Sequence, residues 1–508
     1  MPTPPAMRIA LLPLDDRPVN VSLPQDVARV AGAVVEVPPA KILPNYRTPG
    51  ETGKLSAWLL NRAEDSAVDH LVVSLDMLCY GGLIGGRVGH DTTETALARL
   101  DVLRTIRERR PTLKISAVSL VMRASNSYSA AEEPDYWSTY GKDLHDLGAK
   151  VHNLDGQAVI SPVFEETKVP SDVVADFTLR RLRNHIVNLT ALRLVEEGTL
   201  DFLAVTADDT ARLSAGSAEQ DWLRHWMRFL PHGQTVLMYP GADEVGAVLV
   251  ARAVADFANL SVAIRVSCAE PEGLDRVPSY ENVPLTESIR RQVAAAGAYV
   301  VDHAADVVLV VHAPDPDRHD MWNPIPPSAH EDAVDRTVDA VQRELNAGNS
   351  VALADVRYSN GCDIELVRKL VQLGLVEKLT SFGGWNTAGN TLGGVIATAV
   401  AYVTGAATRS LDSRAKDQAL LTRVLDDFAY QSIIRQEVGA QLFHNHLPMS
   451  DDRAVVAAET TIRDRMNYML EHELNSPGWF VAGLDLPWRR SFEVGIGLRD
   501  AHRGGGKF

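Results

Sequence analysis

Two pairs of adjacent carboxylates carry the strongest chemical signal in the sequence. Asp208 and Asp209 end the segment FLAVTADDT, and Asp243 and Glu244 follow TVLMYP in the segment TVLMYPGADEVG. Carboxylates side by side repel each other, which tends to raise the pKa of one of them and keeps a proton donor near neutral pH. The alternative is that each pair caps the next helix, whose N-terminus favours negative charge. We take these four residues as the candidate catalytic groups.

A charged cluster follows the first apolar run of the chain. The segment LDDRPVN contains Asp15, Asp16, Arg17 and Asn20. A turn in which an Asp caps the next helix, with Pro18 in its first turn, explains this segment about as well as ligand binding does. Because the cluster holds more charge than capping requires, we keep its four polar residues as candidates for substrate binding.

The segment SLDMLCYGGLIGGR contains a strand-end carboxylate, Asp76, and two pairs of glycines. Glycine allows the close approach of a ligand or of another backbone, and tight packing explains the pairs equally well. The segment lacks the Gly-Lys-Ser/Thr of a phosphate-binding loop and the GxGxxG spacing of a dinucleotide site. Asp76 and Arg87 are therefore binding candidates, and we add Arg123, which directly follows the apolar run 114–122.

Two later segments, DVRYSNGCD and FGGWNTAGNTLGG, also place polar residues after apolar runs. A Trp between Gly-Gly and Asn-Thr suits stacking on a sugar face, and a core Trp is an equal alternative. An Asn beside it can donate and accept hydrogen bonds. The binding candidates from these segments are Asp355, Arg357, Asn360, Trp385, Asn386 and Asn390.

The composition of the chain limits the classes of substrate and partner that it can bind. The chain has 508 residues and a formal net charge of -16, which disfavours nucleic acid and anionic membranes as partners. The three cysteines lack metal-ligand spacing, and the sequence has no HExxH zinc motif and no GxSxG elbow. The N-terminus lacks the pattern of a signal peptide, and we expect no segment to span a membrane. We expect a cytoplasmic enzyme of a small molecule without a cofactor, and we leave a homo-oligomer open.

The polar segments are positioned by a repeated pattern of an apolar run followed by an amphipathic stretch. We predict strands at 8–14, 34–38, 70–76, 114–122, 202–208, 235–240, 261–267, 306–312, 350–355 and 380–385, and helices that include 95–110, 181–198 and 333–348. Runs that are apolar on both faces are typical of buried parallel strands. The carboxyl ends of such strands form the ligand-binding face.

This alternation predicts an α/β fold. Our first choice is a modified (β/α)₈-type barrel with extra strands, within an α/β catalytic region at 7–405. The alternative is two doubly wound α/β domains that meet near 270–300. From 409 to 500 the pattern changes to long helices, and we predict a helical C-terminal extension there.

Five strings in the chain resemble a bacterial family of proteins of unknown function: LPLDDRPVN, SLDMLCYGGLIGGR, ADDT, YPGADEVG and GGWNTAGNTLG. In addition, YPGADEV is similar to the GGDEV string of chitobiase-type β-N-acetylhexosaminidases. In those enzymes the acetamido oxygen of the substrate attacks the anomeric carbon, so they are an exception to the usual two-carboxylate scheme. The second resemblance implies that Asp243 polarises the acetamido group and that Glu244 is the general acid. Here Ala242 replaces the second Gly, and Tyr239 stands where that family has His.

These signals lead to one functional hypothesis and two alternatives. The hypothesis is an exo-acting glycoside hydrolase of an acetamido sugar, with Trp385 as the stacking platform. The first alternative is a hydrolase or isomerase that depends on Mg²⁺ or Mn²⁺, with the cation held by oxygen ligands from Asp15, Asp76, Asp208 and Asp243. The second alternative is a sugar-binding protein without catalytic activity.

Overall fold

The computed structural model describes residues 6–154, 167–230, 235–323, 331–442 and 449–501. The chain divides into two compact units. Unit 1 consists of Met1–Asp16, Ala33–Ala253 and Tyr280–Val283. Unit 2 consists of Arg17–Gly32, Val254–Ser279 and Pro284–Phe508. Each unit contains its own parallel sheet and is described separately.

The sheet of unit 1 has six parallel strands in the order β2-β1-β3-β4-β5-β6. The strands are β1 (Arg8–Leu12), β2 (Val34–Glu36), β3 (His70–Ser74), β4 (Lys114–Val121), β5 (Phe202–Ala207) and β6 (Val236–Pro240). Residues of both faces are buried along β3, β4 and β5, as the apolar runs predicted. All six strands therefore end at the same edge of the sheet, where the polar segments begin.

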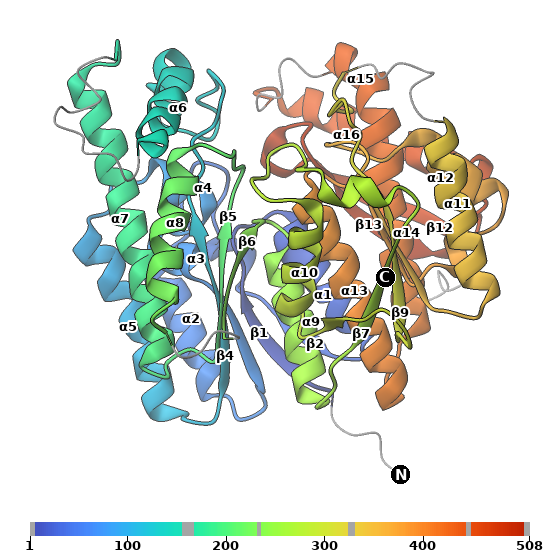
Figure 1. Ribbon diagram of the computed structural model, residues 1–508, viewed down its shortest axis with the longest axis horizontal. Helices are drawn as coiled ribbons and strands as arrows, with labels where there is room; N and C mark the ends of the chain where they lie inside the picture. Colours follow the sequence, from blue (N-terminus) through green and yellow to red (C-terminus); the bar gives the residue numbers. More distant parts are fainter. Residues whose placement is uncertain (1–5, 155–166, 231–234, 324–330, 443–448, 502–508) are drawn as a thin grey trace. The chain divides into compact units, whose positions relative to one another are not determined.

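Helices connect these strands and bury their apolar faces on the sheet. They are α2 (Thr52–Glu64), α3 (Leu75–Tyr80), α4 (Leu83–Val88), α5 (Thr93–Arg109), α6 (Trp137–Asn153), α7 (Ser171–Glu196), α8 (Ala215–Met227) and α9 (Val245–Phe257), which continues into unit 2. Figure 1 shows α2, α5, α7 and α8 on one side of the strands. Leu55, Leu103 and Leu194 from three of these helices join Leu71 and Leu203 of the sheet in one core.

The sheet of unit 2 has five parallel strands in the order β11-β10-β9-β7-β8. The strands are β7 (Ala263–Cys268), β8 (Tyr299–Val300), β9 (Val307–His312), β10 (Val351–Asp355) and β11 (Ser381–Gly383). In chain order this sheet and the first five strands of unit 1 share one arrangement, 2-1-3-4-5. In both sheets the order reverses between the first and third strands, which is where open α/β sheets bind ligands.

Helices cover both faces of the sheet in unit 2. Figure 1 shows α10 (Leu285–Ala295) and α13 (Ala388–Thr408) on one side of it, and α11 (Glu331–Asn346) and α12 (Ile364–Gln372) on the other. The helix that follows β1 in the sequence, α1 (Pro18–Val30), packs against α13 and α14 (Ser413–Arg423). A π-helical segment (Val424–Ile434) continues α14 and leads into α15 (Arg435–Leu442) and then α16 (Asp452–His472).

The end of the described chain contains strands that the sequence did not predict. β12 (Trp479–Asp485) and β13 (Gly495–Asp500) pair in an antiparallel sheet, and Val481 and Leu498 are buried with the core of unit 2. The expectation of helices alone was wrong for this stretch, because most residues of these two strands are exposed or half-exposed and so lack the pattern of burial on both faces that indicated the other strands.

The α/β class predicted from the sequence is confirmed, and all ten predicted strands are present. The first-choice barrel is not what the described strands form. They make two separate open parallel sheets, as in the doubly wound alternative. The two-residue strand β8 was not predicted, because it is too short and too exposed to show a buried pattern.

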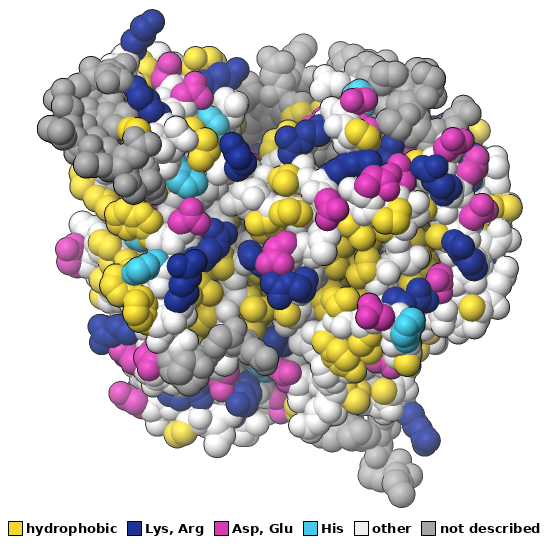
Figure 2. Space-filling model, in the orientation of Figure 1, with side chains coloured by type: hydrophobic (Ala, Val, Ile, Leu, Met, Phe, Trp, Pro, Cys, Tyr) yellow, Lys and Arg dark blue, Asp and Glu magenta, His cyan; other side chains and the backbone are white. Residues whose placement is uncertain are grey.

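Two surface and burial features bear on the partners of the protein. By length and composition α13 is apolar enough to cross a membrane, contrary to the expectation from the sequence, but 67% of its apolar window is buried inside the structure. Figure 2 shows hydrophobic side chains gathered over α7 and α8. Leu179 on α7, Trp222 and Trp226 on α8, and Phe229 just beyond α8 are exposed hydrophobic residues. Exposed apolar patches often mark protein interfaces, so this is the surface to test for the homo-oligomer left open above.

Candidate functional site

The carboxylate pair Asp208–Asp209 directly follows β5 at the carboxyl edge of the unit 1 sheet. The next helix, α8, begins only at Ala215 and is capped by the hydroxyl of Ser214. The helix-cap alternative is therefore wrong for this pair. Asp209 also has a positive φ of 35°, an uncommon conformation for a residue other than glycine. The backbone turns sharply here and directs the two carboxylates to different partners.

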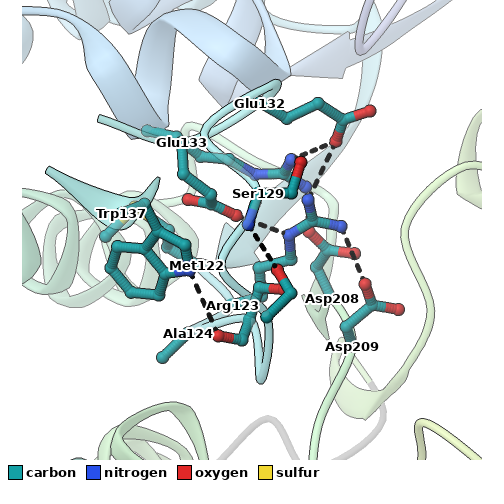
Figure 3. Close-up of polar contacts among 12 residues, drawn as sticks. Met122, Arg123, Ala124, Ser129, Glu132, Glu133, Trp137, Asp208 and Asp209 are labelled. Carbon is teal, nitrogen blue, oxygen red and sulfur yellow. Dashed lines mark hydrogen bonds and ion pairs between the residues drawn. The ribbon is translucent and has the colours of Figure 1, made fainter. Parts of the chain in front are cut away.

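Two arginines from neighbouring strand ends hold this pair (Figure 3). Arg123, which follows β4, donates to Asp209 at 2.8 Å, to Glu133 at 2.7 Å and to Glu132 at 3.0 Å. Arg87, on α4 beyond β3, donates to Glu132 at 2.6 Å and forms an ion pair with Asp208. These contacts join residues that follow β3, β4 and β5, and we call the six residues the carboxylate–arginine network.

The carboxylate–arginine network holds four carboxylates and two guanidinium groups. With every group ionised it carries two more negative than positive charges, so it favours gaining a proton or a cationic group. Burial and the neighbouring charge of Asp208 raise the pKa of Asp209 to about 6, against the attraction of Arg123 and Arg87. The side chain of Asp209 is 30% exposed, so a molecule in solution can reach it.

Side chains of other elements fix the backbone that carries the network. Arg181 on α7 donates to the carbonyl oxygens of Met122 and Arg123 at 2.8 and 3.1 Å. Arg47 donates to the carbonyl oxygens of Ala130 at 2.6 Å and Glu133 at 2.9 Å. The network is therefore positioned by contacts far apart in the sequence.

The sequence analysis missed four of these residues, namely Arg47, Glu132, Glu133 and Arg181. The two glutamates lie in the loop between β4 and α6, and Glu132 is nine residues beyond Arg123. Arg181 lies on a helix whose charges look like an ordinary solvated face. An EE pair in a polar loop gave no reason to single it out. Only the fold brings it to the strand ends.

Asp76 lies at the start of α3, between β3 and β4. Its carboxylate is buried and accepts a hydrogen bond from the backbone N–H of Leu120 at 3.0 Å. Burial raises the pKa of Asp76 to about 7. The glycines after it serve packing, because a Cβ on Gly81 would lie 2.6 Å from the carbonyl oxygen of Gly50. These glycines therefore have a structural explanation within unit 1.

Asp243 and Glu244 follow β6 and directly precede α9. The N–H of Gly241 donates to the carbonyl oxygen of Ala207 at 3.0 Å, which ties this turn to the end of β5. The carboxylate of Glu244 accepts from the N–H of Ala242 at 3.0 Å, and both acidic side chains are buried. Gly241 has a φ of 153°, a conformation that residues with a side chain rarely adopt, and a Cβ there would contact the Glu244 carboxylate, so glycine is favoured at this position. Glu244 thus stabilises its own turn, and its predicted acid role stays a prediction.

The cluster after β1 is divided between the two units. Asp15 and Asp16 belong to unit 1, whereas Arg17 and Asn20 belong to unit 2. Arg17 lies over the ring of Trp488, 4.8 Å from its centroid, and forms an ion pair with Glu493 at 3.6 Å. The N-cap of α1 is Arg17, whose side chain makes no capping hydrogen bond.

In unit 2 the strand-end carboxylate Asp355 is bound to the backbone of its own loop. It accepts from the N–H of Arg357 at 3.1 Å and from the N–H of Asp363 at 2.7 Å. Burial raises the pKa of Asp355 to about 6. Asp363 in turn caps α12 and lies 3.3 Å from His312. Asp355 therefore shapes the loop that carries Arg357.

The segments around Asn360 and Trp385 are adjacent. The N–H of Asn360 donates to the carbonyl oxygen of Asn386 at 2.8 Å, and both asparagines have positive φ. The Trp385 ring is only 4% exposed and packs edge-on against Phe492. Asn390 is buried at the start of α13. The stacking role of Trp385 stays a prediction, because its ring lies largely within the core.

Another residue that the sequence analysis missed supports this region. Asp427, on the π-helical segment, accepts from the N–H of Gly384 at 2.9 Å and pairs with Arg423 at 3.2 Å. Burial raises the pKa of Asp427 to about 7. Because the segment Val424–Ile434 reads as an ordinary amphipathic helix, its sequence gave no sign of this contact.

The described residues of unit 2 line two cavities that bear on a ligand site. A small one of about 20 Å³ is lined by residues that follow β7, β9 and β10, including Asp315, His319, Arg357 and Ser359. A larger one of about 140 Å³ lies among α1, α13 and α14. Of these two cavities, the smaller one lies at the strand ends where the order of the sheet reverses, so it is the better candidate for a ligand-binding site.

Comparison with known proteins supplies a family and no activity. No curated protein and no solved structure matches the chain. One family model, described as "Protein of unknown function (DUF4127)", matches residues 9–497. That range begins within β1, covers the rest of both parallel sheets, the carboxylate–arginine network and β12, and ends within β13. The chain therefore belongs to this family of proteins of unknown function.

Proposed function

We propose that this protein is a hydrolase of a small polar substrate, and within that class a glycoside hydrolase, with Asp208 and Asp209 as its acid–base pair. The observation that carries the proposal is the raised pKa of Asp209, to about 6, in a partly exposed carboxylate beside a second one. A general acid works best when its pKa lies near the working pH.

The charge of the carboxylate–arginine network also supports this class. Glycoside cleavage passes through a transition state with positive charge on the sugar ring. The other three carboxylates of the network outnumber its two arginines, so the surroundings of Asp209 are net negative, which would stabilise that charge. Arg123 and Arg87 hold the carboxylates in place without neutralising them all.

The finer assignment, an acetamido sugar, rests on the resemblance of YPGADEV to the chitobiase-type string. In it Asp243 polarises the acetamido group. We assign the general acid role to Asp209 in preference to Glu244, because the Glu244 carboxylate is buried and accepts a hydrogen bond from Ala242. Turnover of aryl N-acetylhexosaminides but not of aryl hexosides would support the acetamido sugar.

The test is a panel of aryl glycosides assayed with wild type, Asp209→Asn and Asp101→Asn. Asp101 is a matched control, because it is an exposed aspartate of unit 1 outside the network. We expect Asp209→Asn to lose on the order of 10²-fold or more in kcat, the scale of general acid–base catalysis, and Asp101→Asn to match wild type. Wild-type turnover in Asp209→Asn on every substrate would overturn the acid assignment.

Two further comparisons sharpen the assignment. If Glu244→Gln loses activity on natural glycosides but keeps it on aryl substrates with good leaving groups, Glu244 is the acid, as the resemblance implies. Binding of a sugar without turnover would support the alternative of a non-catalytic sugar-binding protein. Loss of activity on chelation would support the metal-dependent alternative.

A further inference from the structure

The loop after β9 brings three metal-binding side chains together in unit 2. Asp315, Asp317 and His319 offer ligand atoms that all lie within 4.8 Å of one another. The loop borders the small cavity at the edge where β7 and β9 are neighbours and the strand order reverses. Parallel α/β sheets bind ligands at this position. We infer that Asp315, Asp317 and His319 bind a divalent cation of the Zn²⁺ or Mn²⁺ class.

The types of ligand support a cation of this class. Two carboxylates supply two negative charges, and a neutral imidazole supplies a nitrogen, a set that suits borderline transition cations better than an all-oxygen site. Three protein ligands leave further coordination positions open, as in catalytic rather than structural sites. Asp317 is exposed and His319 is half-buried, so the site is reached from solvent.

The two carboxylate oxygens of Asp315 have different neighbours. Its Oδ2 lies 2.6 Å from His319 Nδ1 and accepts from the His319 N–H at 3.2 Å. Its Oδ1 lies 3.7 Å from Nη2 of Arg357. The arginine therefore anchors one side of the carboxylate, while the other side faces His319. A cation would take the place of the proton that the two residues share.

A second observation in the same cavity points to a ligand. Arg357 is 2% exposed and Ser359 is 8% exposed, and both line the cavity. Nε and Nη2 of Arg357 and Oγ of Ser359 make no hydrogen bond within the described parts of the chain. Leaving a buried polar group without a hydrogen-bond partner destabilises the folded state. These donors fit oxygen atoms bound to the cation, either water or an anionic group of a substrate.

The simpler explanation is an isolated hydrogen bond between residues four apart in the sequence. That explains Asp315 and His319, but not the approach of Asp317 or the unsatisfied donors of Arg357 and Ser359. A bound cation accounts for all of them. The inference does not depend on the proposed hydrolase activity, because it is tested by binding.

The test measures cation binding to the full chain, purified without a histidine tag, stripped with chelator and dialysed against Zn²⁺ or Mn²⁺. The variant is Asp317→Asn with His319→Gln. The matched control is Asp302→Asn with His303→Gln, an exposed Asp-His pair of the same unit. We expect one ion per chain in wild type and control, and at least about tenfold weaker binding in the variant, since losing even an outer partner of a metal site costs that much.

Thermal unfolding provides a second readout. The cation should raise the Tm of wild type and control but not of the variant, because a ligand stabilises only the state that binds it. Asp317→Asn alone, a change at an exposed position, replaces the double variant if that does not fold. The inference fails if wild type binds no ion or if the variant binds as wild type does. It also fails if inorganic phosphate without a cation raises the Tm and Arg357→Met abolishes the effect.

Discussion

The two units share a strand order but use their strand-end carboxylates differently. In unit 1, Asp208 and Asp209 face arginine side chains from neighbouring strand ends. In unit 2, both oxygens of Asp355 accept hydrogen bonds from backbone N–H groups of its own loop. A carboxylate bound to side chains can change partners when a substrate arrives, whereas one bound to its own backbone holds a loop in shape.

This contrast shows what a strand-end position does and does not imply. The fold brings polar residues to one edge of each sheet, but the local loop decides whether their polar atoms remain available. In unit 2 the loop shaped by Asp355 presents Arg357 to the cavity instead. The side chain available for a ligand is therefore two residues away from the one that the strand end marks.

The largest expected effect is a loss of stability when an arginine is replaced, and we compare this loss between the two units. Arg123→Met should lower the free energy of unfolding by about 3 kcal/mol, because it leaves several partly buried carboxylates without their cation. Arg357→Met should cost less, about 1–3 kcal/mol, because each of its two carboxylate partners has another contact. Glu270 also contacts Arg336, and Asp315, which lies 3.7 Å from Arg357, also contacts His319. Urea denaturation measures both values. A larger loss in Arg357→Met would contradict the comparison.

The second prediction compares two strand-end carboxylates by stability. Asp355→Asn should lower the free energy of unfolding by about 1–3 kcal/mol, because an amide cannot accept both N–H groups as a carboxylate does. Asp209→Asn should stay within about 0.5 kcal/mol of wild type, since asparagine tolerates the positive φ found there. Equal losses in urea denaturation would remove the distinction between the two roles.

The third prediction concerns pH. The folded-state pKa values of Asp76 and Asp427, one in each unit, are raised to about 7, above the value of about 3.9 in an unfolded chain. Between pH 4 and 7 the folded state therefore binds more protons than the unfolded state, and stability falls as pH rises. Tm measured from pH 5 to 8 should decline less in Asp76→Asn than in wild type or Asp101→Asn. Parallel curves would show that Asp76 does not titrate in this range.

The smallest expected effect is that of chelation on activity. A glycoside hydrolase with Asp209 as acid needs no metal at the reacting bond, so its turnover should be unchanged after exhaustive treatment with EDTA. The proposed cation site of unit 2 is separate from this activity, and it is tested by measuring cation binding. Loss of turnover that Mg²⁺ or Mn²⁺ restores would favour the metal-dependent alternative.

The local pattern of the sequence was sufficient to find the main elements of the fold. All ten apolar runs are strands, most of them with buried residues on both faces, and the polar segments after them do lie at strand ends. The same patterns could not choose between one barrel and two open sheets, because a strand buried on both faces reads alike in either arrangement. Strand order depends on which strands pair, and the residues of a single apolar run do not determine its neighbours in the sheet.

The sequence by itself determined the class of fold, the positions of the strand ends and the acidic residues found there. The tertiary structure alone decided which of those carboxylates face other side chains. In unit 1, Glu132 and Glu133 are part of the site because they form ion pairs with Arg123. In unit 2, both oxygens of Asp355 accept hydrogen bonds from backbone N–H groups of its own loop. The physical reason is that strand formation depends on local burial, whereas the environment of a buried charge depends on every group that the fold places within a few ångströms of it.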